Sequence, residues 1–110
     1  MPLFITYASY SQTGVKGLID KPGDRSGAIA ALIQKAGGKL IAMYNTTGSN
    51  DLVIVSEVPD GSDAVAVGMA AAASGAVSKI ETVRAWTSSE FKGITEKAAK
   101  VAGAYTPPGG

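Results

Sequence analysis

The sequence predicts an α+β domain in which helices cover one face of a four-stranded antiparallel sheet. Three observations lead to this prediction. Runs of β-branched and aromatic residues alternate with helical patterns, the order of the elements is β-α-β-β-α-β, and a dense turn joins the two middle strands. At 110 residues, the chain has the length of a single domain.

The first third of the chain predicts a strand, a broken segment and a helix. Residues 3–8 are rich in β-branched and aromatic side chains and predict a buried strand. Glycines and a proline punctuate residues 9–23, so any helix there is short or broken. A longer helix then begins at Asp24 or Ser26, either of which can cap it, and ends at Gly37-Gly38. Its apolar residues have the spacing of one buried face: Ile29, Leu32, Ile33 and Ala36.

The middle of the chain predicts an antiparallel hairpin. Residues 39–46 and 52–58 form its two strands, and the turn formers of residues 47–51 join them. Alternation along the first of these strands places Ile41 and Met43 on one face. Leu40, Ala42 and Tyr44 then lie on the other face.

A second helix and a fourth strand follow the hairpin. The segment Pro59-Asp60-Gly61-Ser62 opens the helix, which consists mostly of small side chains and ends at Gly75. Val65, Met69 and Ala72 share one of its faces. Residues 77–86 predict the fourth strand.

The clearest local signal is at the start of the last helix. Thr87-Ser88-Ser89-Glu90 matches a capping box, and Trp86 and Phe91 are placed to form a hydrophobic staple around it. One face of this helix carries four apolar residues, Phe91, Ile94, Ala98 and Val101. We therefore expect one domain over residues 1–101 and a flexible tail over residues 102–110, which ends in prolines and glycines.

The predicted order of elements is that of the ferredoxin-like arrangement. Helices cover one side of such a sheet, and here the other side also carries apolar residues that need covering. A second copy of the chain is the simplest cover, which predicts a dimeric α+β barrel. Composition supports self-association, because 45% of the residues are hydrophobic and only 17% are charged, against about 25% in a typical domain.

Composition also limits the partners and the location of the protein. The formal net charge of +1 gives no electrostatic reason to expect nucleic acid or an anionic membrane as a partner. No apolar run reaches the ~18 residues of a membrane span, and the N-terminus lacks the pattern of a signal peptide. We expect a cytoplasmic homodimer or higher homo-oligomer, with a small molecule as a further candidate partner.

Two residue types are absent, and their absence limits the chemistry. Without cysteine there is no disulfide, thiolate nucleophile or sulfur ligand for a metal. Without histidine there is no serine–histidine triad, imidazole metal ligand or usual general base near neutral pH. We therefore predict neither a metal site nor a bound cofactor.

Charged residues at two positions are candidates for a site. Asp51 starts the third strand and is either a pocket carboxylate or, in the interpretation that we favour, a turn residue that accepts backbone N–H groups. Arg84 lies within the fourth strand, where a charge needs a partner. It either holds an anionic ligand or, as we expect, forms an ion pair with one of the nearby acids, which are Glu57, Asp51 and Glu81.

Aromatic residues are the other candidates for a ligand site. Tyr7, Tyr10, Tyr44 and Trp86 have the chemistry to line a cavity for an aromatic compound. Aromatic residues in strands more often belong to the core, which is the alternative interpretation.

Several segments together resemble the GYD-domain family over roughly residues 2–95. They are Pro2-Leu3-Phe4-Ile5-Thr6, Gly14-Val15-Lys16, Pro22, Gly37-Gly38-Lys39, Gly48-Ser49-Asn50-Asp51-Leu52-Val53 and Glu81-Thr82-Val83-Arg84-Ala85-Trp86-Thr87. The resemblance implies the dimeric α+β barrel fold. Asn50 stands where the tyrosine of the Gly-Tyr-Asp signature is expected, between Gly48 and Asp51 at its ends.

Two classes of function agree with the sequence. The first is a non-catalytic assembly or small-ligand-binding protein, favoured by the absence of His and Cys and by the sparse charges. The second is a cofactor-independent enzyme, similar to a monooxygenase or an isomerase, that acts on a small aromatic or keto compound between sheet and helices. It would use Tyr7, Tyr44, Asp51 and Arg84, and it requires these groups to converge on one cavity.

Overall fold

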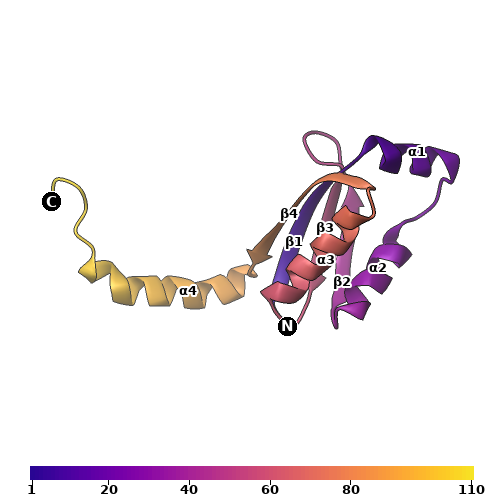
Figure 1. Cartoon of the computed structure of the whole chain (residues 1–110). Coiled ribbons are helices and arrows are strands. Elements are labelled where there is room, and N and C mark those ends of the chain that lie inside the picture. The colour runs from indigo at the N-terminus through magenta and orange to yellow at the C-terminus, as the bar shows by residue number, and fades with distance from the viewer.

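The computed structural model describes all 110 residues and has the predicted α+β architecture (Figure 1). A four-stranded sheet carries helices on one face, and the last helix extends away from it. The elements are β1 (Leu3–Tyr10), α1 (Gln12–Asp20), α2 (Ser26–Lys35), β2 (Lys39–Asn45), β3 (Leu52–Glu57), α3 (Gly61–Ala73), β4 (Val77–Ala85), α4 (Ser88–Val101) and the short 3-10 helix η1 (Ala102–Ala104).

The sheet has the strand order β2-β3-β1-β4, and each neighbouring pair is antiparallel. This order confirms the ferredoxin-like prediction, including the hairpin between β2 and β3. β1 lies in the middle, where Ile5 pairs with Val55 of β3 on one side and with Val83 of β4 on the other. The side chains of these three paired residues therefore lie on one face of the sheet.

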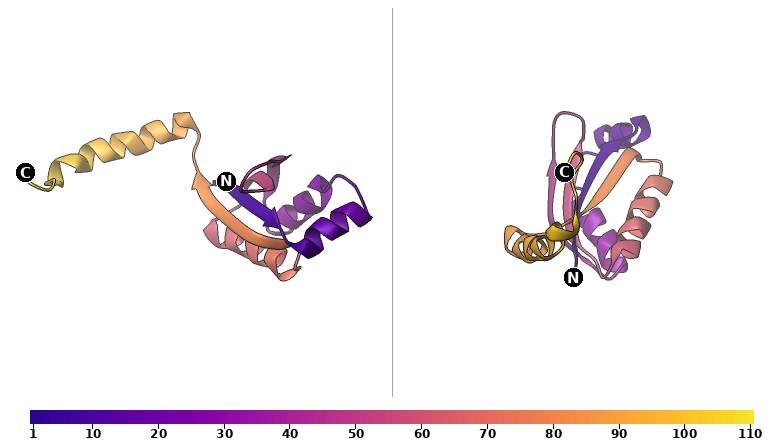
Figure 2. Two further views of the ribbon diagram at one scale, coloured as in Figure 1. Left: turned by 90° about the horizontal axis from the view of Figure 1, so that it is seen from above. Right: turned by 90° about the vertical axis from the view of Figure 1, so that its left-hand side faces the viewer.

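The core lies between the sheet and helices α2 and α3, which cover the same face (Figure 2). It consists of five buried residues: Phe4, Ile33, Ile54, Val58 and Ala64. Ile33 fits the predicted buried face of α2, where Ile29 also packs against this cluster. Few residues are buried, because the opposite face of the sheet has no cover within the chain.

Helix α3 lies on the sheet through its small residues. Ala64 is buried, and a side chain at Gly68 would meet Ile80 of β4 in ordinary contact. The face shared by Val65, Met69 and Ala72 is instead exposed, at 60% for Val65 and 68% for Met69. Small side chains let the helix approach the strands closely, so the bulkier apolar stripe is left facing outward.

Strand β2 departs from the predicted alternation. The register slips between Leu40 and Ala42, which marks a β-bulge. Because of this extra residue, Leu40 and Met43 both pack against the core, although simple alternation placed them on opposite faces. Tyr44 lies on the uncovered face and is 62% exposed.

Helix α4 stands apart from the rest of the molecule (Figure 1). None of its residues is buried, and its one extensive neighbour is η1, which continues it. The predicted capping box is present: Glu90 N–H donates to Thr87 Oγ1, and Thr87 N–H donates to Glu90 Oε1. No helix of the chain is both long and apolar enough to cross a membrane.

Candidate functional site

A cavity of about 480 Å³ opens between α1, α2, α3 and the neighbouring ends of the strands. Most of its wall is hydrophobic and comes from the inner sides of the three helices. Its lining residues are Tyr10, Thr13, Gly14, Gly17, Leu18, Lys21, Arg25, Ala28, Ile29, Leu32, Leu52, Ala70, Ala71, Ser74, Ala76 and Val77. The cavity therefore has the layout of a small-molecule site: an apolar body with a few polar groups.

Helix α1 forms one wall of the cavity, and its N-cap residue Ser11 fixes it to the loop between α3 and β4. Ser11 N–H donates to the Ala76 carbonyl oxygen at 2.9 Å, and the Ser11 hydroxyl donates to the Gly75 carbonyl oxygen at 2.5 Å. The same hydroxyl accepts the N–H of Gly14 and caps the helix. A Cβ at Gly14 would collide with the Ala76 carbonyl oxygen, so only glycine allows this close approach.

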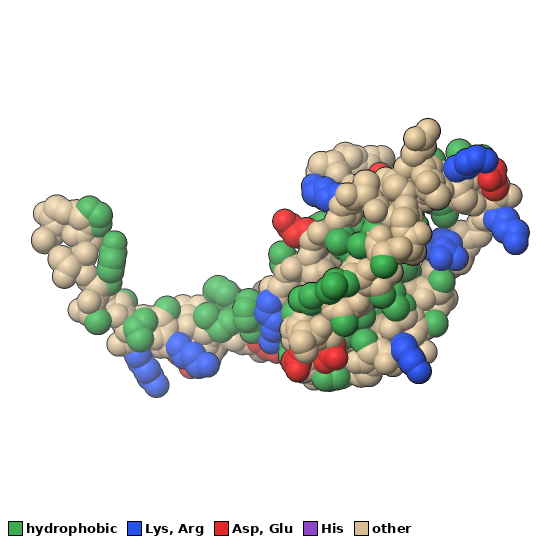
Figure 3. Space-filling view, in the orientation of Figure 1, with side chains coloured by type: hydrophobic (Ala, Val, Ile, Leu, Met, Phe, Trp, Pro, Cys, Tyr) green, Lys and Arg blue, Asp and Glu red, His purple; other side chains and the backbone are tan.

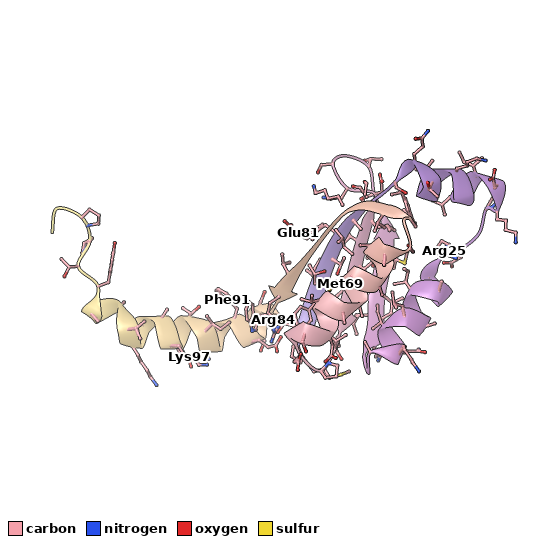
Figure 4. The ribbon with its side chains drawn as sticks, in the orientation of Figure 1. Arg25, Met69, Glu81, Arg84, Phe91 and Lys97 are labelled. Carbon is pink, nitrogen blue, oxygen red and sulfur yellow. The ribbon has the colours of Figure 1, made fainter.

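Two cations, Lys21 and Arg25, line the cavity at the connection between α1 and α2 (Figure 4 labels Arg25). Neither forms an ion pair, since the ion pairs of the chain are Lys16–Asp20 and Lys92–Glu96. Arg25 also lines an adjacent hollow of about 350 Å³, together with Tyr10, Leu18 and Asp24. Both cations are exposed and free to meet an incoming anion.

Asp24 is the carboxylate in this hollow, and it is held by the start of α2. Its Oδ1 accepts the N–H of Ser26 at 2.8 Å, so it serves the helix start as the sequence suggests, although Arg25 occupies the N-cap position itself. Hydrogen bonds from Ser26 lower the pKa of Asp24 below its usual value. The carboxylate is therefore ionised near neutral pH and is a weak proton acceptor.

Two of the three candidate tyrosines lie on the uncovered face of the sheet, away from this cavity. Tyr7 of β1 and Tyr44 of β2 both pair with Val53 of β3, so the three residues form a row across the sheet. Tyr10, by contrast, lines the cavity at the end of β1. Of the predicted aromatic residues, only Tyr10 reaches the space between sheet and helices.

Arg84 and Trp86 meet at the opposite end of β1. The guanidinium carbon lies 4.5 Å from the centre of the Trp86 ring and 5.8 Å from that of Phe4. Its Nη1 donates to the carbonyl oxygens of Leu3 and Ala85. These contacts fix the chain where β4 leads into α4.

The ion pair expected for Arg84 does not form within the chain. Glu57 and Glu81 are paired with Leu3 and Tyr7, which places them on the uncovered face. Arg84 is paired with Phe4 and lies on the other face. Carbonyl oxygens and aromatic rings take the place of the carboxylate partner.

Asp51 joins the hairpin to the end of β1. Its Oδ2 accepts the N–H of Tyr10 at 2.9 Å, and its own N–H donates to the Ala8 carbonyl oxygen at 2.8 Å. The N–H that Asp51 accepts therefore belongs to β1, not to the turn that Asp51 ends. Its neighbour Asn50 has a buried Oδ1 without a hydrogen-bond partner in the chain.

The candidates from the sequence therefore occupy three separate places. Tyr7 and Tyr44 share the uncovered face, Arg84 and Trp86 share one end of β1, and Asp51 is at its other end. No group of three acids comes together as a metal site would require. Sequence reasoning missed Lys21 and Arg25, although their position on both sides of Pro22-Gly23 marks a cationic loop between two helical segments.

A second feature is the uncovered face itself. Its centre carries the apolar residues Ile5, Val53, Val55 and Val83, and the last of these is 38% exposed. Leu3, Tyr7, Ala42, Tyr44 and Ala85 extend the apolar surface towards the margins. We call this surface the open face.

Comparisons with known proteins agree with the fold. The strand order and the two helices on one face define a ferredoxin-like α+β domain. The sequence matches the GYD domain family over residues 4–95, which is most of the chain, and the protein belongs to this family.

The structure resembles the crystal structure of TTHA0845 from Thermus thermophilus, with a TM-score of 0.51 and 19% sequence identity. The match covers 80% of this chain and 96% of that chain. At this identity the likeness concerns the fold alone. A comparison with curated protein sequences finds no match.

Proposed function

We propose that the chain is a non-catalytic, homodimeric protein that binds a small molecule with an apolar body and an anionic group. The observation that carries this proposal is the cavity between α1, α2 and α3. Its volume of about 480 Å³ lies within the range of about 300–1,000 Å³ that is usual for small-molecule sites.

The lining of the cavity supports an apolar ligand body. Leu18, Ile29, Leu32, Leu52 and Val77 form hydrophobic walls on several sides. Each methylene group that such a ligand buries contributes about 0.8 kcal/mol. A short alkyl chain or a small ring would gain enough from burial to bind.

The two free cations support an anionic group on the ligand. Lys21 and Arg25 line the cavity without a carboxylate partner, and no acid is among the residues of the larger cavity. The fork of an arginine guanidinium fits a carboxylate or phosphate with two parallel hydrogen bonds. In a ligand with a carboxylate on an apolar body, the carboxylate would lie beside the two cations and the body would lie against the hydrophobic walls.

The surroundings of the cavity support binding without catalysis. Its hydroxyl groups, on Tyr10, Thr13 and Ser74, have no histidine or other free base among the lining residues. Asp24 is held by Ser26, and its lowered pKa makes it a weak base. The groups expected for an enzyme, Tyr7, Tyr44, Asp51 and Arg84, do not converge on this space.

The open face supports the dimeric part of the proposal. Apolar residues occupy its centre on three neighbouring strands, and no helix of the chain covers them. Two open faces packed against each other would remove this surface from water, as in other proteins built from paired sheets. This pairing leaves the cavity accessible, because the cavity lies on the helix side of the sheet.

Calorimetric titration with octanoate and with octan-1-ol tests the ligand class. We expect octanoate to bind about tenfold more tightly, because only the acid has an anionic group for Lys21 and Arg25. Replacing both cations, Lys21→Gln with Arg25→Gln, should remove this difference. The matched control is Lys16→Gln with Lys79→Gln, which removes two charges outside the cavity and should preserve it.

A cavity-filling variant shows where the probes bind. Ala71→Phe places a bulky ring in the cavity and should abolish binding of both probes, while circular dichroism checks that the chain still folds. If neither probe binds to the native protein, the proposed function is wrong. If both bind equally, the cavity is a ligand site but the anionic assignment is wrong.

A further inference from the structure

Helix α4 is an amphipathic helix with nothing to pack against in its own chain. Phe91, Ile94, Ala98 and Val101 follow each other along one side, and Phe91 and Val101 are 52% and 67% exposed. Hydrophobic side chains along α4 stand well clear of the body in Figure 3. A free helix of this length is marginal in water, so α4 needs a surface that covers this stripe.

The start of α4 sets its direction away from its own sheet. The capping box at Thr87 fixes the first turn, and the stacking of Arg84 on Trp86 holds the residues just before it. In the end-on view of Figure 2, α4 lies on the opposite side of the sheet from α2 and α3. This is the side of the open face, where a second copy would lie.

The chain exposes more surface than an average monomer of its mass, and the excess has the size of a dimer interface. A folded monomer of 11.1 kDa exposes about 5,700 Å² on average, whereas this chain exposes 7406 Å². The excess of about 1,700 Å² is about twice the roughly 800 Å² that each partner buries in a standard interface. Over two copies it amounts to about 3,400 Å², which falls in the range of obligate homodimers. The open face, α4 and the exposed residues 102–110 that follow it all contribute to this excess.

We propose that α4 is an arm that packs against a second copy of the chain, so that α4 of each copy in the homodimer contacts the other copy. This inference rests on the proposed homodimer and names the segment that reaches across it. A dimer with one two-fold axis would cover the open face and the apolar stripe of α4 in both copies, because each copy supplies an open face and an arm. The net charge of +1 per chain opposes this pairing only weakly.

Photo-cross-linking from position 91 tests which chain the arm touches. p-Benzoylphenylalanine replaces Phe91 with a similar ring that reacts with whatever lies next to it. We expect a cross-linked product of two chains, at twice the 11.1 kDa mass of one chain, on a denaturing gel. A product within a single chain would show that α4 folds back on its own body and would overturn the inference.

Substitutions on the two sides of α4 give a second measurement. Phe91→Ser with Ile94→Ser removes the apolar stripe and should raise the dimer dissociation constant by at least about tenfold. Lys92→Ser with Lys100→Ser changes the charged residues instead and is the matched control, with little effect expected. Sedimentation measures the dimer dissociation constant of both double variants.

The outcomes separate this inference from the proposed dimer. If the stripe variant dimerises as tightly as the native chain, the arm is not part of the interface, although the homodimer itself stands. If the native chain is a monomer at about 100 μM, the arm and the proposed homodimer both fail. Ligand binding in the cavity is measured independently of either result.

Discussion

At the scale of single residues, close contacts between backbone segments explain more of the fold than ion pairs do. Gly14 and Gly38 both lie where a side chain has no room. A Cβ at Gly38 would collide with the Glu57 carbonyl oxygen and would lie 2.6 Å from Val58 Cγ1. This glycine allows the turn after α2 to pass directly against the end of β3.

Gly38→Ala should therefore destabilise the fold by about 2 kcal/mol or more, because the backbone must shift to make room. Gly27→Ala is the control: a Cβ there meets nothing within 4 Å, and alanine favours the helix by up to about 1 kcal/mol. Urea unfolding at equal protein concentrations compares the two variants. Equal stability would contradict the proposed crowding at Gly38.

At the scale of elements, the capping box of α4 depends on an ionised side chain. The N–H of Thr87 donates to the Glu90 carboxylate, and this bond is the main cause of the lowered pKa of Glu90. A carboxylate with a lowered pKa stabilises the folded form at pH values above its ordinary value of 4.5. The contribution is lost as the pH falls below 4.5 and through the lowered pKa.

The amide signal of Thr87 should report this loss directly. In a pH titration followed by NMR, we expect the Thr87 signal to shift with a midpoint below 4.5, as the hydrogen bond to Glu90 is lost. In Glu90→Gln, which cannot titrate, this shift should disappear. A midpoint at or above 4.5 would show that the capping box does not favour the ionised form.

At the scale of the whole molecule, the chain is more extended than a compact globule of its length. Its radius of gyration is 17.7 Å, against about 13 Å for a compact chain of this length. Its principal extents are 60 × 32 × 22 Å, and α4 accounts for the long dimension (Figure 1). A second copy would fill the space beside the arm and over the open face.

Val55→Glu tests the proposed pairing of two sheets, because it places a charge at the centre of the open face. Burying this charge without a partner costs several kcal/mol, so the dimer dissociation constant should rise by at least about a hundredfold. Light scattering coupled to size-exclusion chromatography measures the change. Lys79→Glu, at the margin of the same face, is the control, and a dimer that tolerates Val55→Glu must use another surface.

Local patterns in the sequence were enough for the elements and for their order in the sheet. The β-branched runs, Gly37 with its positive φ after α2 and the capping box at Thr87 each depend on interactions within a few residues. The bonds of Asp51 are not local in this sense, because its partners Tyr10 and Ala8 belong to β1, far away in the sequence. The hydrophobic pattern of α2 indicated Ile33 as a buried residue.

The tertiary structure alone decided which surfaces meet. The bulge in β2 brought Leu40 and Met43 to the same side, and close packing of α3 left Val65 and Met69 outside. The cavity with Lys21 and Arg25 exists because α1 is fixed to a distant loop through Ser11. The sequence by itself determined what each segment forms, since short-range preferences act within a segment. Only the folded chain determined which face of each segment is covered and which is exposed, because this depends on packing between segments that are far apart in the sequence.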